Sequence, residues 1–392
     1  MEIKTTSRKV LLGLQMMIVA YPALIVAAAM AGLDATVALF AAGVGTLLFH
    51  GITGGKVPIF LATSFSYAAA VAAATGLYGL PATLGGLMAA GVVYILLGLL
   101  IRIGGVQTIQ RYFPPVVAGP IIIVIGLGLA PAGVGMASAN WIVAVITLAA
   151  TIVVSFFARG LVRALSIVAG IAVGYVAGLA LGVVDFTPLI EAPWFALPRF
   201  TWPVFDWRAI LFVVPVAIAP ALEHIGDILS ISSIARKNFF TEPGVDRTLL
   251  GNGVATFVSA LFGGPGLTTY SEVSGAYAFI GDFDPAFMWI AAVAAIVLSF
   301  VAKLGALLTT IPTSAMGGIV LLLFGLISAI GLRTLVVNEV DFSKARNLFI
   351  AAVVLILGVG GAVWKVGTFE LAGVGLAGCV GVLLNLVLPQ EV

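Results

Sequence analysis

Charged side chains are scarce in this chain of 392 residues, where Asp, Glu, Lys and Arg together make up only 9%. The mean hydropathy is +1.23, and the markedly polar stretches are short, residues 235–248 being an example. Soluble domains carry far more charge on their surfaces. The composition therefore excludes a separate soluble domain, and a net charge of +2 gives no sign of a nucleic-acid partner.

Cysteine and histidine are almost absent. Cys379 is the only cysteine, which excludes a disulfide within the chain. His50 and His224 are the only histidines, and they are too few and too far apart in sequence for a metal centre with several histidine ligands. An intramembrane enzyme would need a nucleophile with a base, or a metal set, and these two residues supply neither. The sequence predicts that the protein is not an enzyme and holds no metal.

Apolar residues, by contrast, make up 62% of the chain and recur in runs of about 20, the length that crosses about 30 Å of hydrocarbon. We therefore expect an all-α polytopic membrane protein with fourteen transmembrane segments in the lipid bilayer. The expected spans are 10–32, 35–51, 57–78, 82–104, 115–134, 140–158, 163–184, 207–235, 246–263, 267–281, 285–308, 313–333, 346–363 and 367–388. The first is an uncleaved span, because many others follow it.

The third and tenth spans are irregular. They begin with GGKVPIFLATSFSY and FGGPGLTTYSEVSG, and Gly, Pro and β-branched residues weaken a helix interior. Both spans are therefore expected to be broken. Helix N-termini just beyond the breaks, near Phe65 and Ser271, would direct free N–H groups and partial positive charge at a ligand.

The distribution of basic residues predicts the orientation. With both termini in the cytoplasm, the outer side takes four of the 18 lysines and arginines, and the inner side takes the other fourteen. Such a bias is the positive-inside pattern, and it requires an even number of spans. The four outer residues are Arg199, Arg208, Lys303 and Lys365.

Short motifs recur in the two halves of the chain in the same order. Pro22-Ala23-Leu24 recurs as Pro220-Ala221-Leu222, and Pro114 with Gly119 recurs as Pro312 with Gly317. Ile125-Gly126-Leu127 corresponds to Phe324-Gly325-Leu326, and ATSFSY corresponds to LTTYSE. Seven spans per half is an odd number, so the halves insert with opposite orientation and form two inverted seven-helix repeats. Such repeats characterise secondary transporters, whose binding sites form near the midplane between irregular helices.

Three carboxylates stand inside this apolar sequence. Glu223 and Asp227 are four residues apart in ALEHIGDIL, on one helical face, and Glu272 lies in LTTYSEVSG. A carboxylate at membrane depth indicates a functional site by default. The alternative is that Glu223 and Asp227 form a structural pair within the bundle, and that Glu272 caps the broken helix. His224 points away from the face that carries the two carboxylates.

These stretches resemble the nucleobase/ascorbate transporter family, also called nucleobase:cation symporter 2, and are most similar to its bacterial uracil permease branch. The resemblance covers the whole chain, and its specific part is the block from Glu223 to Gly275. The matching stretches are TSFSY (63–67), RYFPPVVAGPIIIVIGL (111–127), EHIGD (223–227), KNFFTEPGVDRTLLGNGVATFVSALFGG (237–264) and TTYSE (268–272).

The resemblance implies a fold divided into a core and a gate. The core would comprise residues 1–110 and 196–310, and the gate residues 111–195 and 311–392. It also implies uptake of a small-molecule nucleobase by proton symport, in the inner cell membrane and often as a homodimer. No cofactor is implied; the coupling ion is H⁺, with Na⁺ as the alternative.

Carried over residue by residue, the resemblance assigns a site. Glu223 and Glu272 would bind the edge of the ring, Phe65, Tyr270, Ser271 and Ala23 would line the pocket, and Glu223 with Asp227 would couple transport to the proton. The chemistry agrees, because a uracil-like ring offers adjacent N–H donors and C=O acceptors that carboxylates and main-chain groups can satisfy.

Two departures from the family pattern bear on the substrate. The usual Glu-Asn-x-Gly signature is Glu272-Val273-Ser274-Gly275 here, and Met16 stands where uracil permeases often carry a histidine. Both residues are expected to be packing residues. Glu at position 272, where purine-specific members more often have Gln, favours a pyrimidine.

Three other kinds of membrane protein remain alternatives. A purine or xanthine carrier of the same family differs only in the ring it binds. An anion exchanger can share the inverted plan, but it usually carries a C-terminal cytosolic domain, whereas this sequence ends at Val392 after a span, and site carboxylates repel anions. A channel would show a polar stripe along several helices, which the sequence lacks.

Overall fold

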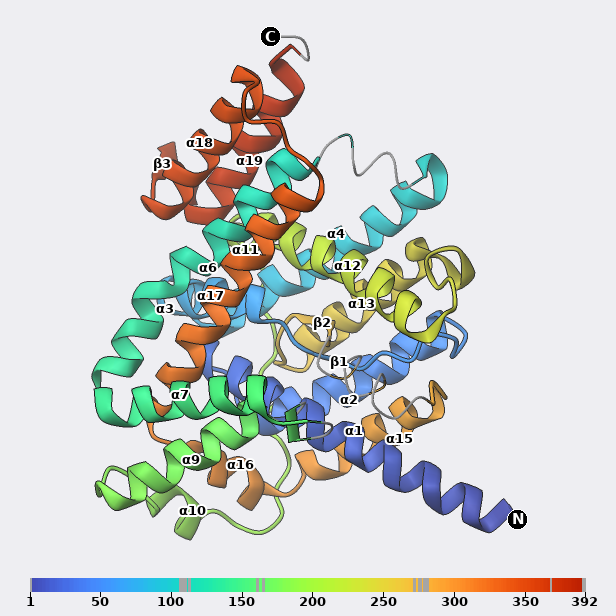
Figure 1. The fold of residues 1–392 in the computed structure, drawn as a ribbon, viewed down its shortest axis with the longest axis vertical. Helices are drawn as coiled ribbons and strands as arrows, with labels where there is room; N and C mark the ends of the chain where they lie inside the picture. The colour runs from blue at the N-terminus through green and yellow to red at the C-terminus, as the bar shows by residue number, and fades with distance from the viewer. Residues whose placement is uncertain are drawn as a thin grey trace.

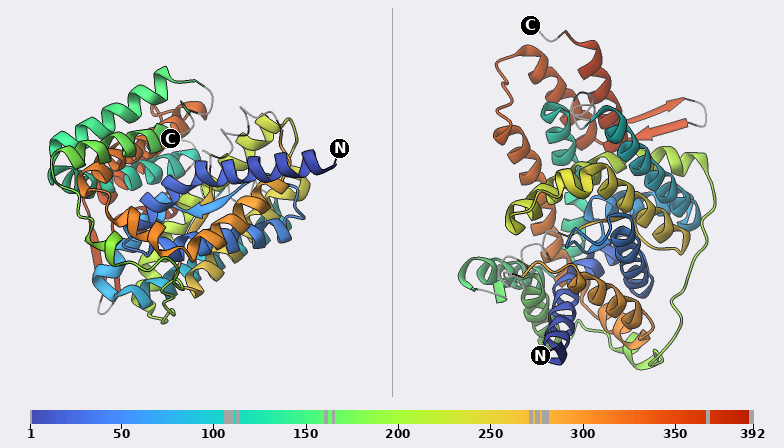
Figure 2. Two further views of the ribbon diagram at one scale, coloured as in Figure 1. Left: turned by 90° about the horizontal axis from the view of Figure 1, so that it is seen from below. Right: turned by 90° about the vertical axis from the view of Figure 1, so that its right-hand side faces the viewer.

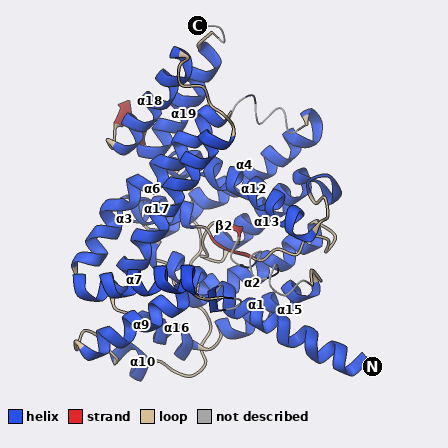
Figure 3. Cartoon of the chain, viewed as in Figure 1, coloured by secondary structure: helices blue, strands red, loops and turns tan. Residues whose placement is uncertain are grey.

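The chain is almost entirely helical (Figure 3) in a computed structural model that describes residues 2–105, 111, 114–159, 162–163, 166–270, 273, 277, 282–366 and 369–389. Many large apolar side chains lie on its surface, among them Ile103 at 87% exposure and Phe157 at 81%. An apolar surface of this extent suits contact with hydrocarbon rather than with water.

The first quarter of the chain forms four helices and a short strand. They are α1 (Glu2–Met30), α2 (Ala35–Ile52), β1 (Leu61–Thr63), α3 (Phe65–Tyr78) and α4 (Leu80–Gly104). Asp34 caps α2, since its Oδ1 accepts a hydrogen bond of 2.7 Å from the backbone N–H of Thr36. Gly79 joins α3 to α4 with a φ of +82°, which favours glycine.

Two further stretches complete the helices before the last quarter of the chain. The first comprises α6 (Pro115–Ser138), α7 (Trp141–Phe157), α9 (Ser166–Ala180) and α10 (Thr187–Glu191). The second comprises α11 (Trp207–Val213), the 3₁₀ turn η1 (Val214–Ala217), α12 (Ile218–Ala235), the π turn η2 (Phe240–Gly244), α13 (Val245–Leu261), β2 (Leu267–Thr269), α15 (Ala286–Ser299) and α16 (Ala302–Thr309).

The C-terminal elements are α17 (Thr313–Val337), α18 (Ala345–Val359), the strands β3 (Val363–Val366) and β4 (Phe369–Ala372), and α19 (Gly373–Val387). Pro312 precedes α17 just as Pro114 precedes α6, so a motif that the sequence repeats stands at equivalent helix starts. The antiparallel strands β3 and β4 form a hairpin that projects from the side of the bundle (Figure 2).

Five helices in the described part of the chain are long and apolar enough to cross a membrane, and seven shorter apolar helices accompany them. The protein is therefore a multi-pass membrane protein. Three expected spans differ in detail. The segment 285–308 is divided into α15 and α16, and the hairpin of β3 and β4 occupies residues that were expected to end one span and begin the next.

The helices pack in two groups. α2 contacts α13 and α15, α15 contacts α1, and α13 contacts α4; separately, α6 contacts α17, α18 and α19, while α7 contacts α9 and α17. In Figure 1 the first group lies towards the N-terminus, and α18 and α19 lie at the opposite end of the long axis with the C-terminus. The two groups meet through α3, α11, α12 and η1, and α1 also contacts α9 directly.

Glycine allows the closest helix contacts. A Cβ added at Gly331 of α17 would lie 2.7 Å from the carbonyl oxygen of Gly119 and 2.7 Å from the backbone nitrogen of Ile123, both on α6. No side chain fits at that distance, so glycine lets the two backbones touch. Small residues at helix crossings are the usual means of close packing in membranes.

At the centre of the molecule β1 pairs antiparallel with β2, with Leu61 opposite Thr269 and Thr63 opposite Leu267. Two buried threonines complete the hydrogen bonding of these three-residue strands. The Thr46 hydroxyl of α2 accepts from the N–H of Leu61 at 2.9 Å and donates to its carbonyl at 3.2 Å. The Thr256 hydroxyl of α13 does the same for Leu267, at 3.2 and 3.3 Å. Extended backbone at this depth needs such partners, because no bulk water is available.

Candidate substrate and proton site

Glu223 and Asp227 lie one turn apart on α12, as their spacing predicts. Each receives a hydrogen bond from a hydroxyl of a different segment. Ser66 Oγ donates to Glu223 Oε2 at 3.1 Å, and Thr269 Oγ1 donates to Asp227 Oδ2 at 2.5 Å. Asp227 is 8% exposed, whereas Glu223 belongs to the exposed class. The two carboxylates thus face different surroundings.

Phe65 and Tyr270 follow the two paired strands, at opposite ends of the antiparallel pair. Phe65 is the first residue of α3, and Tyr270 follows β2 directly. The Tyr270 hydroxyl donates to the carbonyl oxygen of Thr63 at 2.8 Å, and its backbone N–H donates to Phe60 at 3.1 Å. These bonds hold Tyr270 beside the strand pair.

Ala23 of α1 is buried in the apolar cluster that contains Tyr270, with the partly buried Phe65 packed against it. Three of the expected pocket residues therefore lie in one region. Met16 and Val273, the two departures from the family pattern, are completely buried in the same cluster, as packing residues are. The remaining expected site residues, Ser271 and Glu272, lie outside the described part of the chain.

His224 stands between the two carboxylates in sequence but is completely buried on another side of α12. Its ring lies edge-on to Phe49 of α2, with 6.3 Å between ring centroids. Neither ring nitrogen has a hydrogen-bond partner among the described residues. The contact with Phe49 agrees with the expectation that His224 points away from the carboxylate face.

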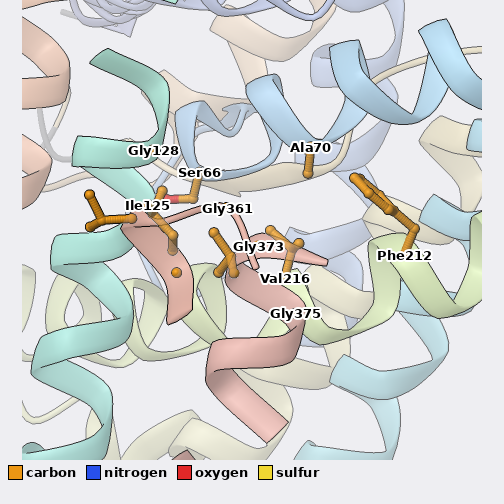
Figure 4. A pocket seen from close by; sticks show the side chains of 12 residues that line it. Ser66, Ala70, Ile125, Gly128, Phe212, Val216, Gly361, Gly373 and Gly375 are labelled. Carbon is orange, nitrogen blue, oxygen red and sulfur yellow. The ribbon is translucent and has the colours of Figure 1, made fainter. Parts of the chain in front are cut away.

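A cavity of about 300 Å³ adjoins Ser66 (Figure 4). It lies between α3, α11 and η1 on one side and α6, α18 and α19 on the other, so its wall is formed by the second packing group and by elements that connect the two groups. The lining residues are Ser66, Ala70, Ile125, Gly128, Phe212, Val216, Gly358, Val359, Gly361, Gly373, Val374 and Gly375. A larger cavity of about 750 Å³ lies near Asp34 and Glu191 and includes none of the expected site residues. Ser66, which lines the smaller cavity, bonds Glu223, but none of the expected site residues that the structure describes is among the lining residues of that cavity.

Some charged residues near the ends of the spans form ion pairs. Lys56 Nζ lies 2.6 Å from Glu242 Oε1, and the hydrogen bond and charge of Lys56 lower the pKa of Glu242. Lys9 Nζ lies 2.6 Å from Asp284 Oδ2. Partial burial raises the pKa of Asp284. Hydrogen bonds from Lys9 and Ala286, together with the positive charges of Lys9 and Lys237, lower the pKa by more than burial raises it, so the pKa lies below its usual value.

Sequence reasoning assigned no role to Ser66 and Thr269, although both stand in motifs it quoted. Each stands next to a predicted site residue, which was the only sign of a role in the sequence. The carboxylates that they bond could not be predicted, because Ser66 is 157 residues from Glu223 and Thr269 is 42 residues from Asp227. Among the described residues no group of three or more His, Cys, Asp or Glu side chains could hold a metal ion.

The fold is that of known membrane transporters. It matches the transmembrane domain of the cyanobacterial bicarbonate transporter BicA with a TM-score of 0.64 and 16% identity, covering 96% of each chain. It also matches the murine Solute Carrier 26 family member A9 anion transporter in its inward-facing state, with a TM-score of 0.70 and 13% identity over 97% of this chain and 67% of that one.

Residues 7–367 match the Permease family, to which this chain belongs. Several relatives cover nearly all of the chain. The probable uracil permease of Haemophilus influenzae is 47% identical over 96% of this chain and 94% of its own length, and the uracil permease of Bacillus caldolyticus is 43% identical over 98% and 93%. The uracil permease of Escherichia coli K12 is 39% identical over 91% and 87%. The protein is a transporter and not an enzyme.

Proposed function

We propose that this protein takes up a nucleobase, uracil or a related pyrimidine, by proton symport with alternating access. The observation that carries the proposal is the near-full-length identity of 39–47% to relatives named uracil permease. Two observations support it: Glu223 is exposed, so its carboxylate can meet the N–H groups of a ring, and α12 contacts β2 of the strand pair.

In this proposal the chain comprises fourteen spans as two inverted seven-helix repeats, with the third and tenth spans broken around β1 and β2. Residues 1–110 and 196–310 form the core, and residues 111–195 and 311–392 form the gate. The separate packing of α1, α2, α4, α13 and α15 on one side, and of α6, α7, α9, α17, α18 and α19 on the other, supports the division. The cavity beside Ser66 lies along the proposed boundary.

The proposed site combines the described residues Ala23, Phe65, Glu223 and Tyr270 with Ser271 and Glu272. Glu223 accepts a proton from outside and binds the ring while it is neutral, and Asp227, one turn away, shares that proton. Two carboxylates this close titrate as a coupled unit. After the core moves against the gate, release of the base inside lets the proton leave to the cytoplasm.

Both termini lie in the cytoplasm in this scheme, the membrane is the inner cell membrane, and two copies form a homodimer. The coupling ion is H⁺, with Na⁺ as the alternative, and no other cofactor takes part. The basic residues assigned to the cytoplasmic side support the orientation.

Anion exchange is the second candidate, because the fold is shared with a bicarbonate transporter and an anion transporter. A carboxylate in the site opposes it, since Glu223 would repel a bound anion unless it were protonated. A purine or xanthine as the substrate is a third possibility within the same family.

Uptake into proteoliposomes tests the proposal. Radiolabelled uracil should accumulate when the outside is acidic, and a protonophore should abolish the accumulation. Xanthine, adenine, bicarbonate and sulfate are the competing solutes. Uptake of bicarbonate or sulfate without uptake of uracil would establish anion exchange instead. Uracil uptake that requires a sodium gradient and not a pH gradient would show that the coupling ion is Na⁺.

A further inference from the structure

The two carboxylates of helix α12 accept hydrogen bonds from both irregular segments, the one that contains β1 and the one that contains β2. Ser66 stands three residues after β1 ends and donates to Glu223, while Thr269 is the last residue of β2 and donates to Asp227. Each carboxylate thus has a hydroxyl partner from a different half of the chain.

The two hydroxyls are held firmly. Ser66 is 7% exposed and Thr269 is 2% exposed. Thr269 is paired with Leu61 across the strand ladder, and Ser66 lies in the first turn of α3, immediately beyond the strand pair. Because the strands and their threonine partners fix the donors, the donors in turn can fix the direction of the carboxylates.

Neighbouring hydroxyls of the same two segments behave differently. Thr63, Ser64 and Thr268 are equally buried, yet their side-chain oxygens have no hydrogen-bond partner among the described residues. The bonds of Ser66 and Thr269 are therefore not a general consequence of burying a hydroxyl here; they arise where a side chain faces α12.

We infer that Ser66 and Thr269 are positioning residues that orient Glu223 for the nucleobase and Asp227 for the proton, an inference that rests on the proposed function. A hydroxyl suits both tasks, since it donates to a carboxylate and accepts from a carboxylic acid. It can therefore keep its partner in place through both protonation states of a symport cycle, which a purely donating side chain cannot do.

The roles of the two hydroxyls should separate. Ser66 acts through the carboxylate that contacts the ring, so its loss should weaken substrate binding even without a gradient. Thr269 acts through the carboxylate that shares the proton, so its loss should reduce gradient-driven accumulation while equilibrium binding changes little.

Equilibrium binding of radiolabelled uracil to the purified full-length protein tests Ser66. Ser66→Ala should weaken binding by about tenfold, at the upper end of the effect of removing one hydrogen bond between neutral groups. Ser66→Thr keeps the hydroxyl and should restore binding to within about threefold. Ser64→Ala is the matched control, because it removes a buried hydroxyl with no partner two residues away.

Accumulation in proteoliposomes under a pH gradient tests Thr269. Thr269→Val keeps the branched shape of the side chain and removes the donor, so accumulation should fall several-fold while the Kd for uracil stays within about threefold. Thr269→Ser should recover most of the accumulation. Thr268→Val, the neighbouring residue on β2, is the control, since its hydroxyl has no partner among the described residues.

Three outcomes separate the possibilities. If the unmodified protein binds no uracil, the proposed function fails and this inference fails with it. If it binds uracil but Ser66→Ala and Ser64→Ala behave alike, the inference alone is overturned. A loss in Ser66→Ala that Ser66→Thr does not restore, together with a lower unfolding temperature in detergent, shows a packing role and overturns it as well.

Discussion

At the scale of single residues, Glu223 and Asp227 share a helix face but not an environment. Glu223 is exposed and accepts a hydrogen bond from Ser66, which lines a cavity, whereas Asp227 is buried against Thr269. An exposed carboxylate can meet a solute, while a buried one can hold a proton out of solvent contact. The pair therefore suits the division between substrate binding and coupling that we propose.

Replacing Glu223 tests the coupling directly. Glu223→Gln keeps the shape of the side chain but cannot exchange a proton, so we expect proton-driven accumulation of uracil to disappear. Glu339→Gln, at a loop after α17, is the control and should transport normally. Concentration of substrate against a gradient by Glu223→Gln would show that another group carries the proton.

The Lys9–Asp284 ion pair gives a prediction about pH. The pKa of Asp284 is lowered in the folded protein, so the pair stabilises the fold above the unfolded pKa of about 4 and loses this effect as pH falls through the folded pKa. Asp284→Asn should lower the unfolding temperature in detergent at pH 7, and the difference should shrink below about pH 4. A difference that grows on acidification would contradict the prediction.

At the scale of elements, the strand pair and the helix crossings matter most. β1 and β2 are only three residues long, and each depends on a threonine from a neighbouring helix. The crossing of α6 and α17 depends on glycines in the same way, because their backbones touch. Small polar or small apolar side chains at a few positions therefore determine where the main elements lie.

Thr46→Val should destabilise the protein by about 1–3 kcal/mol, since it leaves the buried N–H of Leu61 without its partner. Thr334→Val is the control, because Thr334 is only half-buried and its hydroxyl bonds its own helix at Ile330. Chemical unfolding in detergent measures both variants, and equal stabilities would refute the role given to Thr46.

Gly331→Ala should be destabilising by about 1–3 kcal/mol, because the new Cβ would overlap the backbone of α6. Gly325→Ala on the same helix meets no atom within 4 Å and should be neutral or slightly stabilising. Thermal unfolding of the two variants compares the same substitution at touching and open positions. Similar melting temperatures would mean that α6 and α17 are farther apart than described.

At the scale of the whole molecule, two packing groups meet along a boundary that contains a cavity. A carrier needs such a boundary, since one body must move against the other while the site stays between them. The apolar outer surface places the boundary within the bilayer.

The orientation of the whole chain can be measured by labelling. In a Cys379→Ser background, a cysteine at Ala196 should react with a membrane-impermeant maleimide in intact cells, and one at Ser343 should react only after the membrane is opened. Both positions are exposed in the fold. The reverse pattern would place the termini outside.

Local sequence patterns predicted some features of the structure and missed others. The spacing of Glu223 and Asp227 placed them on one face of a helix, and the short strands β1 and β2, which the sequence did not predict, lie within the two motifs expected to be irregular. The hairpin of β3 and β4 was missed, because VWKV and FELA are short apolar runs whose periodicity does not distinguish strand from helix.

Composition and local pattern by themselves determined that this chain lies in a membrane, that it is helical, and that it keeps carboxylates within an apolar sequence, because these properties depend on residues close together along the chain. Only the tertiary structure decided which hydroxyl bonds each carboxylate and which helices line the cavity. Those contacts join residues far apart in sequence, and their selection depends on how all the helices pack at once.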